Sequence, residues 1–383
     1  MAEVLRPATE AELAELARAA ETPFEIIGSG TKRTLGRPVE ASRQLDMSGF
    51  SGIIAYEPEE LILDVAVATR LSEVESMLAA RGQQLAFEPP DYSALLGSAH
   101  SGTVGGLVAC NLAGPRRIKA GAARDHILGV RGVTGAGDIF KAGARVVKNV
   151  TGYDLPKLLT GSFGTLAAMT SVILKVLPAP ETEETIVLTG LGDAEAVHAM
   201  SLAMQSPCEV AGAAHVPGEA VYLRLEGIAP SVADRRDTLA KMMKTPVEVL
   251  AARSSAAKWR AIRDGSAFAD RPHHPLWKLS VTPSEAPEII RRLKDKTDLR
   301  HVFDWAGGLI WLEVPPAVDA HADLIRSAFS SGHATLIRAP EDTRAAVDVF
   351  QPQPDALAAL SARVKASFDP RHILNPGRMY RGH

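Results

Sequence analysis

The sequence predicts an α+β protein with two successive regions, and three observations support this class. Helix-forming and strand-forming patterns alternate through residues 1–178. Glycine recurs every few residues between Gly97 and Gly164, which is typical of tight turns and close backbone approach. Between residues 185 and 338 the order strand–helix–strand–strand–helix–strand occurs twice, which is the order of a ferredoxin-like unit.

Composition and charge exclude several functional classes. The chain has 383 residues, 46% hydrophobic and 23% charged, enough for two or three domains with a substantial core. Its 42 Lys+Arg and 45 Asp+Glu give a net charge of −3, which disfavours binding to nucleic acid or to an anionic membrane. Two cysteines, Cys110 and Cys208, are too few for a disulfide framework, an iron–sulfur cluster or a structural zinc. The first residues lack a basic, apolar leader and no run of 18 apolar residues occurs, so we expect a cytoplasmic protein.

The first elements follow from capping and alternation. Thr9 and Glu12 form a capping box that begins a helix. Residues 24–27 predict a short strand, and the alternation over residues 61–67 predicts a second strand. Ser72 begins a further helix. The chain therefore opens with helix, strand, strand and helix.

A hairpin and a proline segment delimit the first region. Residues 130–134 and 139–142 flank a Gly-Ala-Gly-Asp turn, and residues 170–176 alternate as a last strand. Pro178-Ala179-Pro180 cannot continue a central strand, so we place a domain boundary there. The predicted domains are residues 1–178, 179–350 and 351–383.

The second region shows an apparent duplication. The first copy covers residues 185–189, 193–205, 209–213, 221–226, 231–243 and 247–250, and the second covers 277–281, 284–294, 301–304, 309–314, 319–329 and 335–338. A helix near residues 256–263 separates the copies, and a final helix is predicted over residues 355–368.

Several common sites are excluded. Position 33 is Arg, so Gly28-x-Gly30 does not complete the G-x-G-x-x-G motif of dinucleotide-binding folds, and no P-loop or metalloprotease motif occurs. His273 and His274 are adjacent and precede Pro275, so we expect loop residues and no metal site.

Three glycine-rich segments predict a large ligand that carries phosphate. In residues 28–32 consecutive backbone N–H groups can form an anion-binding nest, with Thr31 and Lys32 adding a hydroxyl and a charge, although a plain β-turn is the alternative. Residues 101–117 and 143–166 are also rich in small residues, and a loop-rich subdomain without a ligand is the alternative for them.

These segments carry a resemblance to a known family. Residues 27–31, 103–106, 121–129 and 147–154 resemble the FAD-binding domain of the vanillyl-alcohol-oxidase/p-cresol-methylhydroxylase (PCMH) family, and residues 368–378 resemble its C-terminal segment. The resemblance implies a two-subdomain PCMH-type FAD-binding domain followed by an α/β cap domain, which contains the ferredoxin-like repeats.

The resemblance also implies which residues hold the cofactor. The FAD pyrophosphate would be held by Gly28, Ser29, Gly30, Thr31 and Lys32, with Thr103, Gly105 and Gly106 on the opposite side. The flavin or ribityl chain would be approached by Ala109, Asn111 and Gly114, and the adenosine half would be contacted, or the subdomain closed, by Gly121, Arg124, Asp125 and Ile127. The tail would be brought to the flavin edge by Asn375, and Lys148 is also assigned to the cofactor site. Some family members attach FAD through a histidine in the first glycine loop. Ser29 and Thr31 stand there in this chain, so non-covalent FAD is expected.

Within the family, residues 148–155 and 114–117 most resemble the E-type flavin subunits of bacterial glycolate oxidases (glycolate dehydrogenases). The implied partners are a sister flavin subunit, D, and an iron–sulfur subunit, F, which passes electrons to quinone. The implied location is the cytoplasm, with peripheral contact to the inner membrane through the complex.

One departure bears on catalysis. Related single-chain 2-hydroxyacid dehydrogenases carry an H-x-G-D-G-N-x-H run in the cap, where residues 303–311 of this chain have Trp305 and Trp311 and no histidine. The catalytic residues are therefore unknown, since nothing in the sequence places Arg338, Arg378, Lys148 or His372 over a flavin. Two alternatives stay open: a self-sufficient 2-hydroxyacid dehydrogenase and a non-catalytic scaffold.

Overall fold

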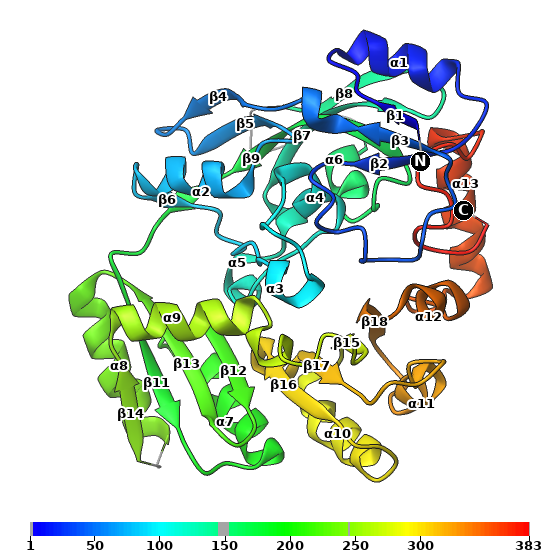
Figure 1. The fold of residues 1–383 in the computed structure, drawn as a ribbon. Helices are drawn as coiled ribbons and strands as arrows, with labels where there is room; N and C mark the ends of the chain where they lie inside the picture. The colour runs from blue at the N-terminus through cyan, green and yellow to red at the C-terminus, as the bar shows by residue number, and fades with distance from the viewer. Residues whose placement is uncertain (1–2, 145–152, 244–245, 383) are drawn as a thin grey trace. The chain divides into compact units, whose positions relative to one another are not determined.

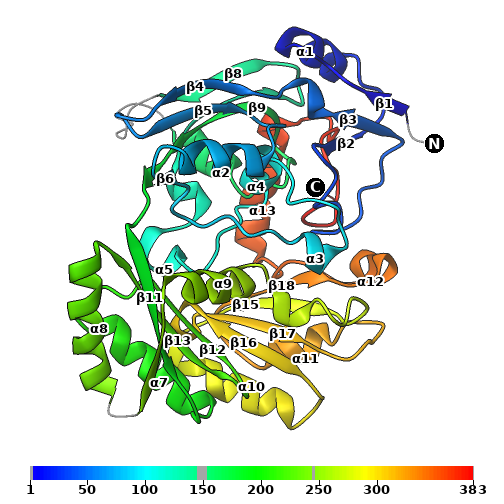
Figure 2. The ribbon, with the colours of Figure 1, turned by 60° about the vertical axis from the view of Figure 1, so that its left-hand side comes forward.

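The computed structural model describes residues 3–144, 153–243 and 246–382, and the chain divides into two compact units. The first unit comprises residues 1–112, 122–178 and 352–383, and the second comprises 113–121 and 179–351. Figures 1 and 2 show both units. Residues 113–121, which the sequence analysis placed in the first domain, thus cluster with the second unit.

A small parallel sheet opens the first unit. Its order is β1 (Glu3–Leu5), β3 (Arg43–Asp46) and β2 (Phe24–Ile27). Between β1 and β2 lies α1 (Glu10–Arg18), where the Thr9 hydroxyl accepts a hydrogen bond from the backbone N–H of Glu12 at 3.2 Å. The predicted Thr9 cap is confirmed, but the Glu12 carboxylate accepts from the backbone N–H of Ala8 at 2.7 Å and not from that of Thr9, so the second half of the predicted capping box is displaced by one residue.

The larger sheet of the first unit is antiparallel and has five strands. Its order is β4 (Ile53–Glu57), β5 (Ile62–Ala66), β9 (Ala167–Lys175), β7 (Ile127–Thr134) and β8 (Ile139–Gly143). Further elements of this unit are α2 (Leu71–Ala79), the two-residue strands β6 (Gln83–Gln84) and β10 (Leu177–Pro178), α3 (Ser93–Leu96), α4 (Val104–Ala109), α6 (Leu155–Leu159) and α13 (Asp355–Phe368). The core lies where α4 packs on β5 and β9, because Val65, Val104, Val108 and Val172 are all fully buried there.

The C-terminal tail lies beside β2. Leu374 bridges Phe24 in the parallel sense, and the Phe24 N–H donates to the carbonyl of Ile373 at 2.7 Å. The buried Lys365 ammonium holds the tail from α13 by donating to the carbonyls of Thr165 (2.6 Å) and Leu374 (3.0 Å). The last residues of the chain thus complete the same unit as the first.

The second unit is built on one antiparallel sheet of eight strands. Its order is β14 (Val247–Leu250), β11 (Thr182–Leu188), β13 (Ala220–Gly227), β12 (Gly212–Val216), β16 (Arg300–Asp304), β17 (Leu309–Glu313), β15 (Leu276–Ser280) and β18 (His333–Arg338). Each half of this order is a ferredoxin-like arrangement, so the predicted duplication is confirmed. The two halves meet through the pair His215 and Phe303.

Helices cover both faces of the eight-stranded sheet. They are α7 (Asp193–Gln205), α8 (Ala229–Met243), α9 (Ala252–Arg263), α10 (Ala286–Lys294), α11 (Ala322–Ser327) and α12 (Glu341–Ala346), with α5 (Arg117–Ala120) in the segment that joins from the first unit. The larger core contains side chains of α7, α8, α10 and α11, while Trp259 of α9 packs on Tyr222 at the opposite face. Figure 2 shows α9 across the strands.

Among the helices of the described residues, none has both the length and the apolar character needed to cross a lipid bilayer.

Candidate functional site: a glycine-lined cavity in the first unit

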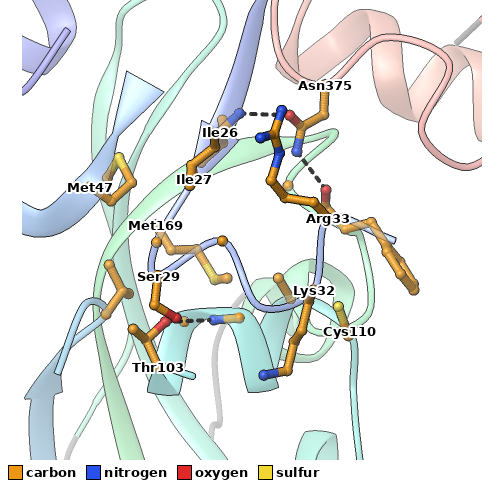
Figure 3. Close-up of a pocket in the computed structure, with 18 of the residues that line it drawn as sticks. Ile26, Ile27, Ser29, Lys32, Arg33, Met47, Thr103, Cys110, Met169 and Asn375 are labelled. Atoms are coloured by element: carbon orange, nitrogen blue, oxygen red, sulfur yellow. Dashed lines mark hydrogen bonds between the residues drawn. The ribbon is translucent and has the colours of Figure 1, made fainter. Parts of the chain in front are cut away.

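A cavity in the first unit collects most of the glycine-rich segments. It contains about 770 Å³ of unfilled space, part of it open to solvent, which is within the usual range for ligand sites. Its wall consists of Ile26, Ile27, Gly28, Ser29, Gly30, Thr31, Lys32, Arg33, Met47, Val67, Thr103, Gly105, Gly106, Ala109, Cys110, Phe163, Gly164, Ala167, Met169, Asn375 and Arg378. Figure 3 shows most of these residues around the turn that follows β2.

The turn after β2 approaches the N-terminus of α4 closely. A Cβ atom on Gly28 would lie 2.9 Å from the Thr103 hydroxyl, so any side chain there would force the two segments apart. Gly30 has φ +74°, a conformation that non-glycine residues rarely adopt. At Gly28 and Gly30, therefore, the backbone of this turn borders the cavity with no side chain between them.

Thr103 fixes the opposite wall. Its hydroxyl accepts a hydrogen bond from the N–H of Gly106 at 3.3 Å and so caps α4. At the other end of α4, the carbonyl of Ala109 accepts from the N–H of Phe163 at 2.8 Å. Both ends of this short helix are thereby tied to the cavity wall.

Three cations line the cavity, and they differ in their protein partners. The Arg33 guanidinium pairs with Glu25 (Nε to Oε1, 2.9 Å), and Arg378 donates to the carbonyls of Arg37 and Lys32, both at 3.2 Å. The Lys32 ammonium donates to the Ser101 carbonyl at 2.9 Å and contacts no carboxylate among the described residues. Burial lowers the pKa of Lys32 because it disfavours the charged ammonium. An anionic ligand that enters the cavity would stabilise this charge.

Asn375 brings the tail to the cavity. Its Oδ1 accepts from the N–H of Ile26 at 2.8 Å, and its Nδ2 donates to the carbonyl of Phe163 at 2.8 Å (Figure 3). One side chain thus joins β2, the loop before β9 and the C-terminal tail. Elsewhere on the cavity wall, burial raises the pKa of the Cys110 thiol to about 11, so this thiol is neutral at physiological pH.

The structure brings together ten of the residues proposed from the sequence. They are Gly28, Ser29, Gly30, Thr31, Lys32, Thr103, Gly105, Gly106, Ala109 and Asn375.

Six others lie off the cavity wall. Asn111 accepts from the Arg124 N–H at 3.1 Å, Asp125 accepts from the Ala122 N–H at 2.8 Å, and Ile127 is buried at the start of β7. The remaining two, Gly114 and Gly121, belong to the second unit. Lys148 lies outside the described residues.

The remaining wall residues include several that sequence patterns did not indicate. Met47 and Met169 are brought to the cavity from separate segments by tertiary packing, whereas Phe163 belongs to the glycine-rich segment of residues 143–166. Arg378 was noted only as a cation of unknown place, and the structure puts it on the wall. Arg338, by contrast, is held in the second unit by Glu313 (3.1 Å) and by the carbonyls of Phe268 and His274, which is a structural role.

The fold and the cavity define a class of protein, namely an FAD-binding oxidoreductase. A family model described as an FAD binding domain matches residues 1–143. The solved structure of alkyldihydroxyacetonephosphate synthase superposes with a TM-score of 0.65 at 15% identity, covering 97% of this chain and 76% of that chain, so the two share their fold. The glycine turn, the Thr103 cap and the Lys32 ammonium fit the phosphates of FAD, because close backbone N–H groups and an unbalanced cation suit an anion.

Curated relatives narrow the class to one family. Glycolate oxidase subunit GlcE of Escherichia coli (strain K12) is 35% identical over 364 residues, 94% of this chain and 93% of its own length. Glycolate oxidase subunit GlcD of Bacillus subtilis (strain 168) is 34% identical over 165 residues, 43% of this chain and 34% of its own length. D-lactate dehydrogenase of Archaeoglobus fulgidus is 31% identical over 34% of this chain and 32% of its own length. The chain belongs to the GlcE family of FAD-binding oxidoreductase subunits.

Proposed function

We propose that this chain is the FAD-binding E subunit of a heteromeric glycolate dehydrogenase, which oxidises glycolate to glyoxylate. The observation that carries the proposal is the match to GlcE along nearly the whole of both chains. The proposed partners are a sister flavin subunit, D, and an iron–sulfur subunit, F, that delivers electrons to an acceptor such as quinone. Cys110 and Cys208 are the only cysteines, so an iron–sulfur cluster held by thiolates requires another chain.

The residues of this chain bind and orient the cofactor. FAD, when bound, supplies the ring that accepts hydride. Backbone N–H groups of the turn at residues 28–31 and the Lys32 ammonium are proposed to hold its pyrophosphate, with Thr103 on the opposite wall. Ser29 and Thr31 have no imidazole to bond covalently to flavin, so the cofactor is proposed to be non-covalent.

Substrate activation is assigned to the complex. Trp305 and Trp311 stand where related single-chain enzymes have histidines, and both are buried in the second unit, with 9% and 3% of their surface exposed. A buried indole cannot accept the hydroxyl proton of a 2-hydroxyacid. We therefore propose that the sister flavin subunit supplies the catalytic base and that the complex works in the cytoplasm, in peripheral contact with the inner membrane.

One observation favours the second candidate, a self-sufficient 2-hydroxyacid dehydrogenase. Burial, together with the charge of Arg117, lowers the pKa of Lys278 to about 8. Its ammonium lies 4.8 Å from the ring centre of Trp305 and 5.2 Å from that of Trp311, and among the described residues it forms no ion pair. A cation so placed is suited to a carboxylate, although a base for the hydroxyl proton is still required.

The test is an anaerobic titration of the purified chain with glycolate, alone and with subunits D and F. We expect a flavin absorption band that glycolate does not bleach in the isolated chain and does bleach in the complex. Bleaching in the isolated chain would favour the self-sufficient enzyme. A chain that purifies without flavin and takes up none from added FAD would contradict both and leave the scaffold alternative.

A further inference from the structure

The segment of residues 113–121, here called the strap, leaves the first unit and returns to it. It begins after Leu112, close in sequence to the cavity residues Ala109 and Cys110, and the chain re-enters the first unit at Ala122. Asn111 Oδ1 accepts from the N–H of Arg124 at 3.1 Å, so the two ends of the strap are joined within the first unit. Only Cys110, Asn111 and Leu112 separate the end of α4 from the strap, so a displacement of the strap reaches α4 through this short piece of backbone.

The strap is held by the second unit at two places, Trp305 and Glu226. The indole Nε1 of Trp305 donates to the carbonyl of Gly114 at 3.1 Å, and the Arg117 guanidinium lies 4.5 Å from the centre of the Trp305 ring. Arg116 adds an ion pair with Glu226 at 2.7 Å. Trp305 thus contacts the strap through both its N–H group and its ring.

Trp305 has a backbone conformation that needs external support. Trp305 and Ala306 have φ of +50° and +57°, and two successive non-glycine residues in this region are rare. The backbone N–H of Trp305 donates to Asp304 Oδ1 at 2.7 Å, and the Lys278 ammonium lies 4.8 Å from the centre of the indole ring. Strained residues of this kind persist where the surrounding structure fixes them, and they concentrate at functional sites.

We propose that Trp305 is a positioning residue for the cofactor, which sets the Ala109–Cys110 wall of the FAD cavity by holding the strap. The proposal deepens the proposed function and rests on it. Trp305 does not touch the cavity wall, and its effect passes through Gly114 and the covalent connection at Leu112.

The experiment compares two tryptophan variants of the full chain. Trp305→Phe keeps an aromatic ring and removes the N–H that bonds Gly114. Trp277→Phe is the matched control, because its Nε1 donates to the Ala320 carbonyl at 2.9 Å and Arg326 lies 5.2 Å from its ring centre, with no contact to the strap. Both variants remove one buried indole–carbonyl hydrogen bond in the second unit.

The readouts are the dissociation constant for FAD, from quenching of flavin fluorescence, and the visible circular dichroism of bound flavin. We expect Trp305→Phe to raise the dissociation constant about tenfold, the loss that one hydrogen bond supports, and to change the dichroism. We expect Trp277→Phe to leave both at wild-type values while lowering the melting temperature. Arg117→Met, on the strap itself, provides a second variant should Trp305→Phe fail to fold.

Wild-type FAD affinity and wild-type dichroism in both Trp305→Phe and Arg117→Met would overturn the proposal. Equal losses of FAD affinity in Trp305→Phe and Trp277→Phe would also overturn it. Failure of the wild-type chain to bind FAD would instead reject the proposed function, and this inference with it.

Discussion

Gly30 is a residue of the cavity wall whose backbone conformation disfavours any side chain. Its φ of +74° puts it in the left-handed region, and it lies between Ser29 and Thr31 in the turn that faces the cavity. A β-branched residue adopts this conformation only with strain of roughly 1–3 kcal/mol. The turn would move to relieve that strain, and its N–H groups would no longer converge.

Gly30→Val is therefore expected to purify without FAD and to fail to bind added FAD, as measured by absorption and by fluorescence quenching. Gly82→Val is the matched control, because Gly82 has φ +63° just after α2 and is not on the cavity wall. The control should lose comparable stability and keep its flavin. A yellow Gly30→Val protein would contradict the assignment of this turn to the cofactor.

At the scale of elements, one carboxylate links helices α7 and α10 to both halves of the second unit's sheet. Asp193, the first residue of α7, accepts from His301 on β16 at 2.9 Å, lies 3.4 Å from His215 on β12, and pairs with Lys294 of α10 at 3.0 Å. Burial opposes the charge of Asp193, yet hydrogen bonds from His215 and His301 lower its pKa. Burial also lowers the pKa of His301, and the Asp193 charge offsets this only in part.

These directions predict that the second unit loses stability in mild acid. Because the folded state holds His301 with a lowered pKa, the unfolded state binds more protons below about pH 6.5, and the free energy of unfolding falls as the pH falls from 7 to 5. The lowered pKa of Asp193 adds a loss in the same direction at still lower pH. Denaturant titrations across this range measure the effect.

His301→Gln should flatten this dependence between pH 7 and pH 5, and the exposed His333 offers a control, His333→Gln, that should not. An identical pH dependence in wild type and His301→Gln would contradict the assignment.

Elements with a local signal could be predicted from the sequence, and elements defined by distant partners could not. The alternation over residues 61–67 and the Thr9 cap indicated β5 and α1 correctly. The strand β1 was missed because it is three residues long and exists through parallel pairing with β3, where Glu3 is opposite Arg43. Helix α4 was missed because two glycines interrupt its six residues, and its stability comes from burial against β5 and β9.

The candidate site divides in the same way. Residues 28–32 could be placed at the site because glycines directly after a strand predict a turn whose backbone N–H groups can meet an anion. Met47 and Met169 reach the cavity only through tertiary packing, which leaves no local pattern. The excursion of Gly114 and Gly121 into the second unit likewise has no sequence signal, since the strap lacks any hydrophobic period.

At the scale of the whole molecule, the glycine-lined cavity belongs to one unit alone. All of its wall residues lie in residues 1–112, 122–178 or 352–383. A ligand that binds only the folded state stabilises it by about 2.7 kcal/mol at a hundredfold excess over its dissociation constant. The protection should therefore concentrate in the unit that holds the ligand.

Hydrogen exchange with and without FAD checks this expectation. We expect slower exchange in β2, α4 and the tail around Asn375, and little change in α8 and β14 of the second unit. Equal protection of α8 would contradict the placement of the cofactor within the first unit.

The tail beside β2 also has a consequence for biosynthesis. Asn375 is 212 positions from its partner Phe163 in the sequence, and Asn375 and Arg378 both form part of the cavity wall. Domains fold as they leave the ribosome, N-terminal parts first, but this cavity stays incomplete until residues 375–378 have been synthesised and have packed beside β2. Flavin loading thus has to wait for the whole second unit to be translated, although that unit contributes no residue to the cavity wall.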